Sequence, residues 1–150
     1  MLVKERLEAL EKLVGIAALG GVNMVINQKS LRLEGQFMLP DNRSQVCFVR
    51  PVVKLRDKIV VTFFSAALRV KKGFLSGVSK EMAVDLLRRN ENLLFARYGM
   101  MSDEEADMIV ASADYLLETL DPEEFAHAVW HVAIAADVYE KEKSGGKDEF

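Results

Sequence analysis

Two histidines four positions apart are the first residues in this sequence whose types and spacing could do chemistry. His127 and His131 lie in a segment with helical periodicity, so both imidazoles fall on one helix face, as the histidines of a zinc site do. The residues between them are "AVW", without the glutamate that zinc hydrolases use as a general base. Glu123 lies one turn before His127, but a glutamate and a histidine at this spacing are more often a weak surface pair. We therefore expect no metal, no cofactor and no catalytic residue.

Nucleophilic and phosphate chemistry have weaker support still. Cys47 is the single cysteine, and its apolar run "QVCFV" has no neighbouring charge to lower the pKa of the thiol. No serine or threonine lies in an elbow-like context, and no glycine-rich segment has the spacing of a phosphate loop. The carboxylates at 103–105 could bind a cation, but such a run is usually a solvated turn. These observations argue against an enzyme.

The composition limits the class of protein. Half of the 150 residues are hydrophobic, which suits one domain that buries roughly 70% of its unfolded surface. A net charge of −3 is opposite to that of a typical nucleic-acid-binding protein. A lone cysteine fits a reducing compartment, and no apolar run approaches the ~20 residues of a membrane span. We expect a cytoplasmic protein that binds neither nucleic acid nor membrane.

The first half of the chain predicts a helix followed by strands. Helical spacing marks residues 1–19, with the apolar positions Val3, Leu7, Leu10, Val14 and Ala17. Residues 22–26 are a short strand candidate. Alternating residues at 31–39, turn formers at 40–44 and a β-branched and aromatic run at 45–49 predict a hairpin. Residues 58–70 are apolar almost throughout, which is typical of a central strand.

The second half predicts two further helices with strands between them. Ser79 is placed to cap a helix that stops near Asn90, with a buried stripe of Met82, Ala83, Leu86 and Leu87. Residues 93–98 look like a strand. Residues 102–120 fit a helix by their capping box or an extended segment joined to 93–100 by the loop "SDEEAD". Asp121 and Pro122 begin a final helix with the stripe Phe125, Val129, Val132, Ala136 and Tyr139.

Three segments, "DNRSQVCFV" (41–49), "LLRRNENLLFARYGM" (86–100) and "LDPEEFAHAVWHVAIAADVYE" (120–140), resemble the bacterial YbjN-like sensory transduction regulators, whose fold is that of type III secretion chaperones. The likeness covers about 20–140. It implies an α+β fold, with an antiparallel sheet and flanking helices in the order α-β-β-β-α-β-β-α, and a homodimer. It also makes 107–117 a strand, which we adopt. The domain then spans 1–142, and 143–150 is expected to be a disordered tail.

The resemblance also implies a function without catalysis, in which an apolar groove holds an extended segment of another protein. We expect a dimeric, chaperone-like or regulatory protein. Its predicted partner surface comprises Val3, Leu7, Leu10, Phe37 and Leu39. Its predicted subunit interface comprises Met82, Leu86, Leu87, Phe95 and Tyr98. The alternatives are a small metal-dependent enzyme that uses His127 and His131, and a small-ligand sensor with a pocket between the sheet and the helices.

Overall fold

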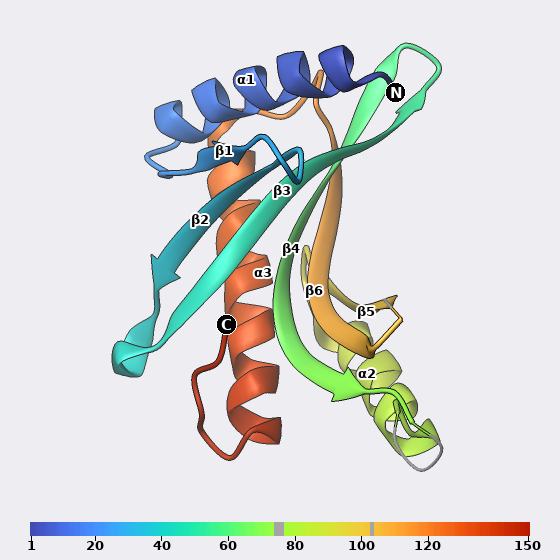
Figure 1. Cartoon of the computed structure of the whole chain (residues 1–150). Coiled ribbons are helices and arrows are strands. Elements are labelled where there is room, and N and C mark those ends of the chain that lie inside the picture. The colour runs from blue at the N-terminus through green and yellow to red at the C-terminus, as the bar shows by residue number, and fades with distance from the viewer. Residues whose placement is uncertain (74–76, 103) are drawn as a thin grey trace.

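The computed structural model, which describes residues 1–73, 77–102 and 104–150, is an antiparallel six-stranded sheet with three flanking α-helices (Figure 1). The α+β fold class predicted from the sequence is confirmed. Its elements are α1 (Val3–Leu19), β1 (Val25–Asn27), β2 (Arg32–Met38), the 3₁₀ turn η1 (Pro40–Asn42), β3 (Ser44–Leu55), β4 (Lys58–Lys71), α2 (Lys80–Asn92), β5 (Arg97–Ser102), β6 (Ala106–Leu116) and α3 (Pro122–Lys143).

The sheet has the strand order β1-β2-β3-β4-β6-β5. β4 lies between β3 and β6, as its apolar sequence predicts for a central strand. β6 is paired along β4 and β5, so the extended interpretation of 107–117 is confirmed. Four strands precede α2, where the resemblance implied three, because the short segment β1 pairs with β2 at the sheet edge.

One face of the sheet is covered by helices. α3 packs across β3, β4 and β6, and α1 packs against α3 and the β1–β3 end of the sheet. Figure 1 shows α3 running behind the strands and α1 lying across one end of them. At the centre, Phe63 of β4 meets Phe125 of α3 edge to face, with ring centroids 4.9 Å apart. The core therefore lies between the sheet and α3.

α3 begins as its sequence predicts. The Asp121 carboxylate accepts from the Glu124 backbone N–H at 2.8 Å, and the Glu124 carboxylate accepts from the Asp121 N–H at 3.2 Å. The predicted stripe from Phe125 to Tyr139 is buried throughout. Gly20, at the end of α1, lies so close to this helix start that an added Cβ would stand 2.4 Å from the Pro122 carbonyl oxygen. A glycine is therefore required where α1 meets α3.

The segment between α2 and β5 differs from its prediction. Residues 93–98 were predicted to be a strand, but β5 begins at Arg97, and Phe95 has a positive φ of 64° that no strand contains. α2 also continues to Asn92, two residues beyond its predicted stop. The reason is that the Asn90 side chain bonds to the backbone of Tyr98, which shifts the start of β5. Phe74 and Leu75, which the sequence predicts to lie in an unusually apolar loop, are outside the described residues.

Candidate functional site

The two histidines of α3 lie near each other on one face of the helix. Their ring centroids are 6.3 Å apart and their planes are nearly perpendicular. His131 lies against the ring of Phe95, at 4.9 Å, and His127 is exposed. In the part of the chain that the structure describes, neither histidine belongs to a cluster of three metal-ligating side chains. The geometry thus gives His127 and His131 no third ligand.

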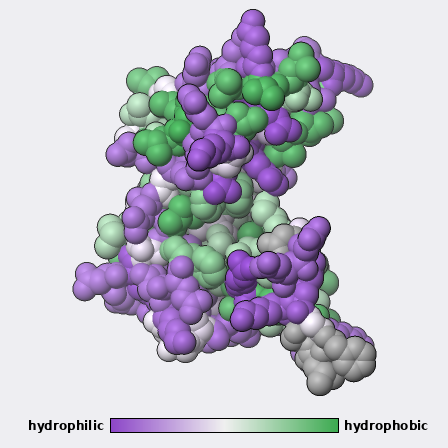
Figure 2. All heavy atoms as spheres, viewed as in Figure 1, coloured by the Kyte–Doolittle hydropathy of each residue, from purple (hydrophilic) through white to green (hydrophobic). Residues whose placement is uncertain are grey.

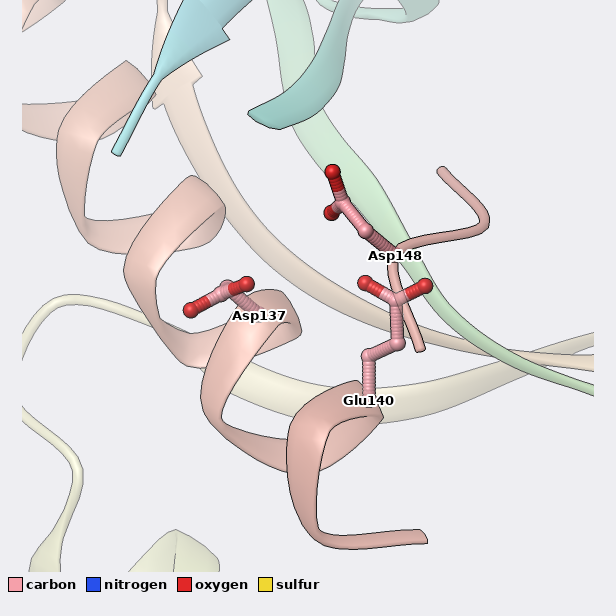
Figure 3. A group of neighbouring side chains, drawn as sticks. All are labelled: Asp137, Glu140 and Asp148. Carbon is pink, nitrogen blue, oxygen red and sulfur yellow. The ribbon is translucent and has the colours of Figure 1, made fainter. Parts of the chain in front are cut away.

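Three carboxylates do come together at the C-terminal end of α3. Ligand oxygens of Asp137, Glu140 and Asp148 lie within 4.8 Å of one another (Figure 3). The guanidinium of Arg43 lies among them: its Nε pairs with Asp137, and one terminal nitrogen lies 3.0 Å from Glu140 and 3.7 Å from Asp148. Arg43 already supplies the positive charge that such a cluster needs. We interpret the cluster as a buried ion-pair network and not as a cation site.

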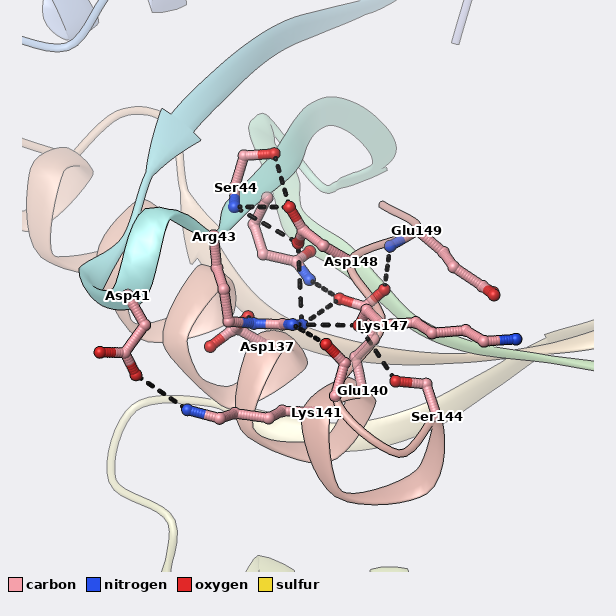
Figure 4. Close-up of polar contacts among 12 residues, drawn as sticks. Asp41, Arg43, Ser44, Asp137, Glu140, Lys141, Ser144, Lys147, Asp148 and Glu149 are labelled. Carbon is pink, nitrogen blue, oxygen red and sulfur yellow. Dashed lines mark hydrogen bonds and ion pairs between the residues drawn. The ribbon is translucent and has the colours of Figure 1, made fainter.

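This network fastens the end of the chain to the sheet. The second terminal nitrogen of Arg43 donates to the carbonyl oxygens of Gly146 at 3.1 Å and Lys147 at 3.0 Å, and Asp148 accepts from the Ser44 N–H at 3.2 Å (Figure 4). The Glu149 N–H donates to Glu140. The tail, predicted to be disordered because it has nothing apolar to bury, is thus held in the structure by polar contacts.

Cys47 is placed as a core residue. Its side chain is fully buried, and its thiol lies 3.7 Å from the carbonyl oxygen of Val129 in α3. Burial raises the pKa of the Cys47 thiol to about 12. A thiol with such a pKa is protonated near neutral pH, which makes it a poor nucleophile.

The predicted partner surface is mostly turned inward. Leu10 is completely buried, and Phe37 and Leu39 are also in the core, whereas Leu7 is half-buried and Val3 is exposed. The physical reason is that the apolar stripe of α1 is covered by α3 and the sheet of the same chain. A partner cannot contact Leu10, Phe37 or Leu39 in this conformation.

The five residues of the predicted subunit interface differ in how far they are exposed. Leu86 and Tyr98 belong to the core cluster, and Met82 is half-buried against it. Leu87 is 69% exposed and Phe95 is 62% exposed. The prediction that Leu87 belongs to the buried stripe of α2 is therefore wrong. Of the five residues, Leu87 and Phe95 are the ones that present large apolar surfaces to a neighbour.

Leu87 borders an apolar groove between α2 and the edge of the sheet. The groove has a volume of about 440 Å³. Its apolar walls include Val78, Leu86 and Leu87 on one side, and Tyr98, Met100 and Ile109 on the other. Asn90 and Asp107 are its polar residues. Such a space, mainly apolar with a few polar groups, is the kind that binds ligands or peptide side chains.

The groove runs along β5, the last strand of the sheet. At Tyr98, the Asn90 side chain takes the place of a further strand: it accepts from the Tyr98 N–H at 2.7 Å and donates to the Tyr98 carbonyl at 3.1 Å. Because backbone groups alternate in direction along a strand, Met100 is the next residue whose N–H and C=O point away from β6. Among the described residues, none bonds to Met100 from that side. The edge of β5 is therefore capped at Tyr98, and at Met100 its backbone groups are open to a partner.

A second exposed apolar area lies on α3, and we call it the Phe95 surface. It comprises Trp130, Ile134 and Val138, spaced one helical turn apart, together with Leu94 and Phe95. Sequence reasoning missed the three α3 residues because it followed the buried stripe alone. The available signal was that α3 carries apolar residues on its opposite face as well.

Comparison with known proteins assigns no identity to the chain. No family model matches it, and no curated protein matches it in sequence. Within the described ranges, no helix is both long and apolar enough to cross a membrane.

Proposed function

We propose that this chain is a non-catalytic protein-binding module that acts as a homodimer. The observation that carries the proposal is the apolar groove beside the open edge of β5. Exposed strand edges are usually blocked by charged residues, proline or a covering element, because they pair readily with other chains. Here Asn90 covers Tyr98, while the next position, Met100, is uncharged and half exposed (55%).

The groove suits an extended segment of another protein. Such a segment would pair its backbone with the N–H and C=O of Met100 and place every second side chain against Leu87 and Val78 in the groove. Backbone pairing gives affinity for any extended chain, and the apolar walls select the side chains. This arrangement needs no catalytic group.

A photo-crosslinking experiment tests this proposal. We expect benzoylphenylalanine at position 87 to crosslink to a second protein chain in a lysate of the source cell, because Leu87 borders the groove. Arg88 is the matched control, since it is also exposed but lies on the polar side of α2. Gel electrophoresis and mass spectrometry would identify the products. Crosslinking at position 87 that is no stronger than at position 88 would contradict the proposal.

The Phe95 surface is the proposed contact between two subunits. A left-handed conformation costs a residue with a Cβ about 1–2 kcal/mol, and a bulky residue is rarely found there. The chain accepts this strain to hold an aromatic ring that is mostly exposed in the single subunit. Such strain is found most often at functional sites. Burial of Phe95 against the same surface of a second copy accounts for both the strain and the exposure.

Replacing Phe95 by glycine tests whether this residue is needed for dimerisation without disturbing the fold of the subunit. Glycine adopts a positive φ without strain, so we expect the Phe95→Gly chain to remain folded, with an unchanged circular dichroism spectrum. We also expect it to be monomeric in size-exclusion chromatography with light scattering, where the wild type is a dimer. Leu19→Ser, at an exposed position of α1, is the control and should stay dimeric. A monomeric wild type, or a Phe95→Gly dimer, would refute the interface.

The YbjN-like family assignment and a cytoplasmic location are part of the same proposal. They are supported by the α+β order of the elements and by a free, buried Cys47, which suits a reducing compartment. The pairing of β6 between β4 and β5 agrees with the strand that the family likeness implied.

A further inference from the structure

The face of the sheet opposite α3 carries the partly exposed side chains of Arg32, Phe48 and Arg50, and Phe64 on the same face is 6% exposed. Core positions on β3 and β4, such as Val49 and Phe63, alternate with residues that point to this open face. In Figure 1 the open face is toward the viewer, and Figure 2, from the same side, shows apolar atoms in the middle of the molecule, mixed apolar and hydrophilic residues above them and mostly hydrophilic residues below them. Phe48 and Phe64 are paired across β3 and β4 on this face.

Two arginines lie over these two phenylalanines. The rings of Phe48 and Phe64 are stacked, with centroids 5.1 Å apart. The guanidinium carbon of Arg32 lies 4.1 Å from the centre of the Phe48 ring, and that of Arg50 lies 5.3 Å from the centre of the Phe64 ring. Arg32 and Arg50 flank the paired residues Leu33 and Val49, so they face each other across the two strands. Two like charges placed opposite each other destabilise a sheet unless something compensates them.

Only one of the two arginines is compensated within the described part of the chain. The Nε of Arg32 donates to the Glu34 carboxylate at 2.7 Å. Thr62, the cross-strand neighbour of Arg50, donates to the Asp114 carboxylate, and among the described residues no ion pair joins Asp114 to Arg50. Among the described residues, Arg50 has no ion pair or hydrogen bond, and its Nε is buried without an acceptor. Within the described residues, the Arg50 guanidinium therefore lies over the Phe64 ring without an ion-pair partner.

We propose that this arginine and the two rings form a second binding site, which takes a glutamate or aspartate side chain of a protein partner together with an apolar neighbour of that residue. The inference rests on the proposed role as a protein-binding module. A guanidinium with free terminal nitrogens binds a carboxylate through two parallel hydrogen bonds, and the partly exposed Phe48 ring offers the neighbouring side chain an apolar contact. One uncompensated charge matches a carboxylate better than a phosphate dianion, because Glu34 already neutralises Arg32.

Short peptides test this site directly. The probes are the acetylated tripeptide amides Phe-Glu-Phe and Phe-Gln-Phe, which differ in charge and share their apolar groups. We expect the glutamate peptide to shift the NMR signals of the Arg50 side chain and the Thr62 amide, and to bind about tenfold more tightly than the glutamine peptide, because a hydrogen bond to a charged group is worth more than a neutral one. Its binding should weaken as salt is added.

Two variants separate the arginines. Arg50→Gln should reduce the affinity for the glutamate peptide about tenfold, whereas Arg32→Gln should reduce it less than about threefold, because Arg32 is already paired with Glu34. Equal binding of the two peptides, or no effect of Arg50→Gln, would overturn the proposal. Displacement of the peptide by an equal concentration of inorganic phosphate would also overturn it, in favour of a free-anion site. Crosslinking at position 87 is a separate measurement. If the peptides fail to bind at Arg50, the proposal for the groove is therefore unaffected.

Discussion

Replacing Arg43 by methionine will lower the free energy of unfolding by about 3–5 kcal/mol, because it removes one partner of a buried ion-pair network and leaves its acids uncompensated. Arg43 is 5% exposed and Glu140 is 1% exposed. Methionine keeps much of the side-chain volume but supplies no hydrogen-bond donor. Glu140 would retain only the Gln45 amide, at 2.8 Å, and the Glu149 N–H as donors. Unfolding by guanidinium chloride, followed by circular dichroism, measures the loss.

The control for this prediction is the exposed ion pair beside it. Lys141 lies 2.9 Å from Asp41, and both side chains are more than half exposed. Lys141→Met should therefore cost less than about 1 kcal/mol. A loss of less than about 1 kcal/mol for Arg43→Met would mean that the network contributes no more than a surface pair.

The same variant has a defined pH dependence. Burial raises the pKa of Glu140, and the charge of Arg43 opposes that rise. Without Arg43 the pKa of Glu140 rises further above its value in the unfolded chain, so the folded state binds the additional proton. A group of this kind costs stability as pH rises through the interval between its unfolded and folded pKa values. The stability lost in Arg43→Met should therefore be greatest near neutral pH and smaller in acid, below the raised pKa of Glu140.

Local sequence patterns predicted the helices and strands of this fold better than they predicted which of their residues are exposed. Asp121 and Glu124 form the capping box that their spacing indicates, and β4 is central as its continuous apolar sequence indicates. These features depend on residues that are close in sequence. The stripe of α1 was also recognised, but its spacing cannot say whether Leu10 is covered by the same chain or by a partner. In the structure it is covered by the same chain.

The parts that sequence reasoning missed depend on contacts between distant residues. Arg43 stands in a segment read only as a turn, and its acids lie about a hundred residues later in the sequence. Phe95 lies in a run whose composition favours a strand, yet it is displaced from the sheet by the bond between Asn90 and Tyr98. No local pattern encodes either contact. The open edge at Met100 depends on the place of β5 at the end of the strand order, which is also set by contacts between distant residues, so the groove could not be predicted from propensities.

Replacing Phe63 by alanine will lower the free energy of unfolding by about 3–5 kcal/mol, the range for deletion of a buried aromatic ring. Phe63 is fully buried on the central strand and makes edge-to-face contacts with Phe125 at 4.9 Å and with Tyr115 at 5.6 Å. Its loss leaves a cavity between β4 and α3, because backbone pairing on both sides of β4 limits how far the sheet can collapse.

Phe48→Ala is the matched comparison for this substitution, since it removes the same ring from the open face, where Phe48 is only half-buried. We expect it to cost about 1–2 kcal/mol, because less apolar surface returns to water and no enclosed cavity forms. Fluorescence of Trp130, the single tryptophan, reports unfolding at α3 in both variants. If the two variants lowered the free energy of unfolding equally, the core would not lie between the sheet and α3. The proposal that the opposite face is free to bind a partner would then also fail.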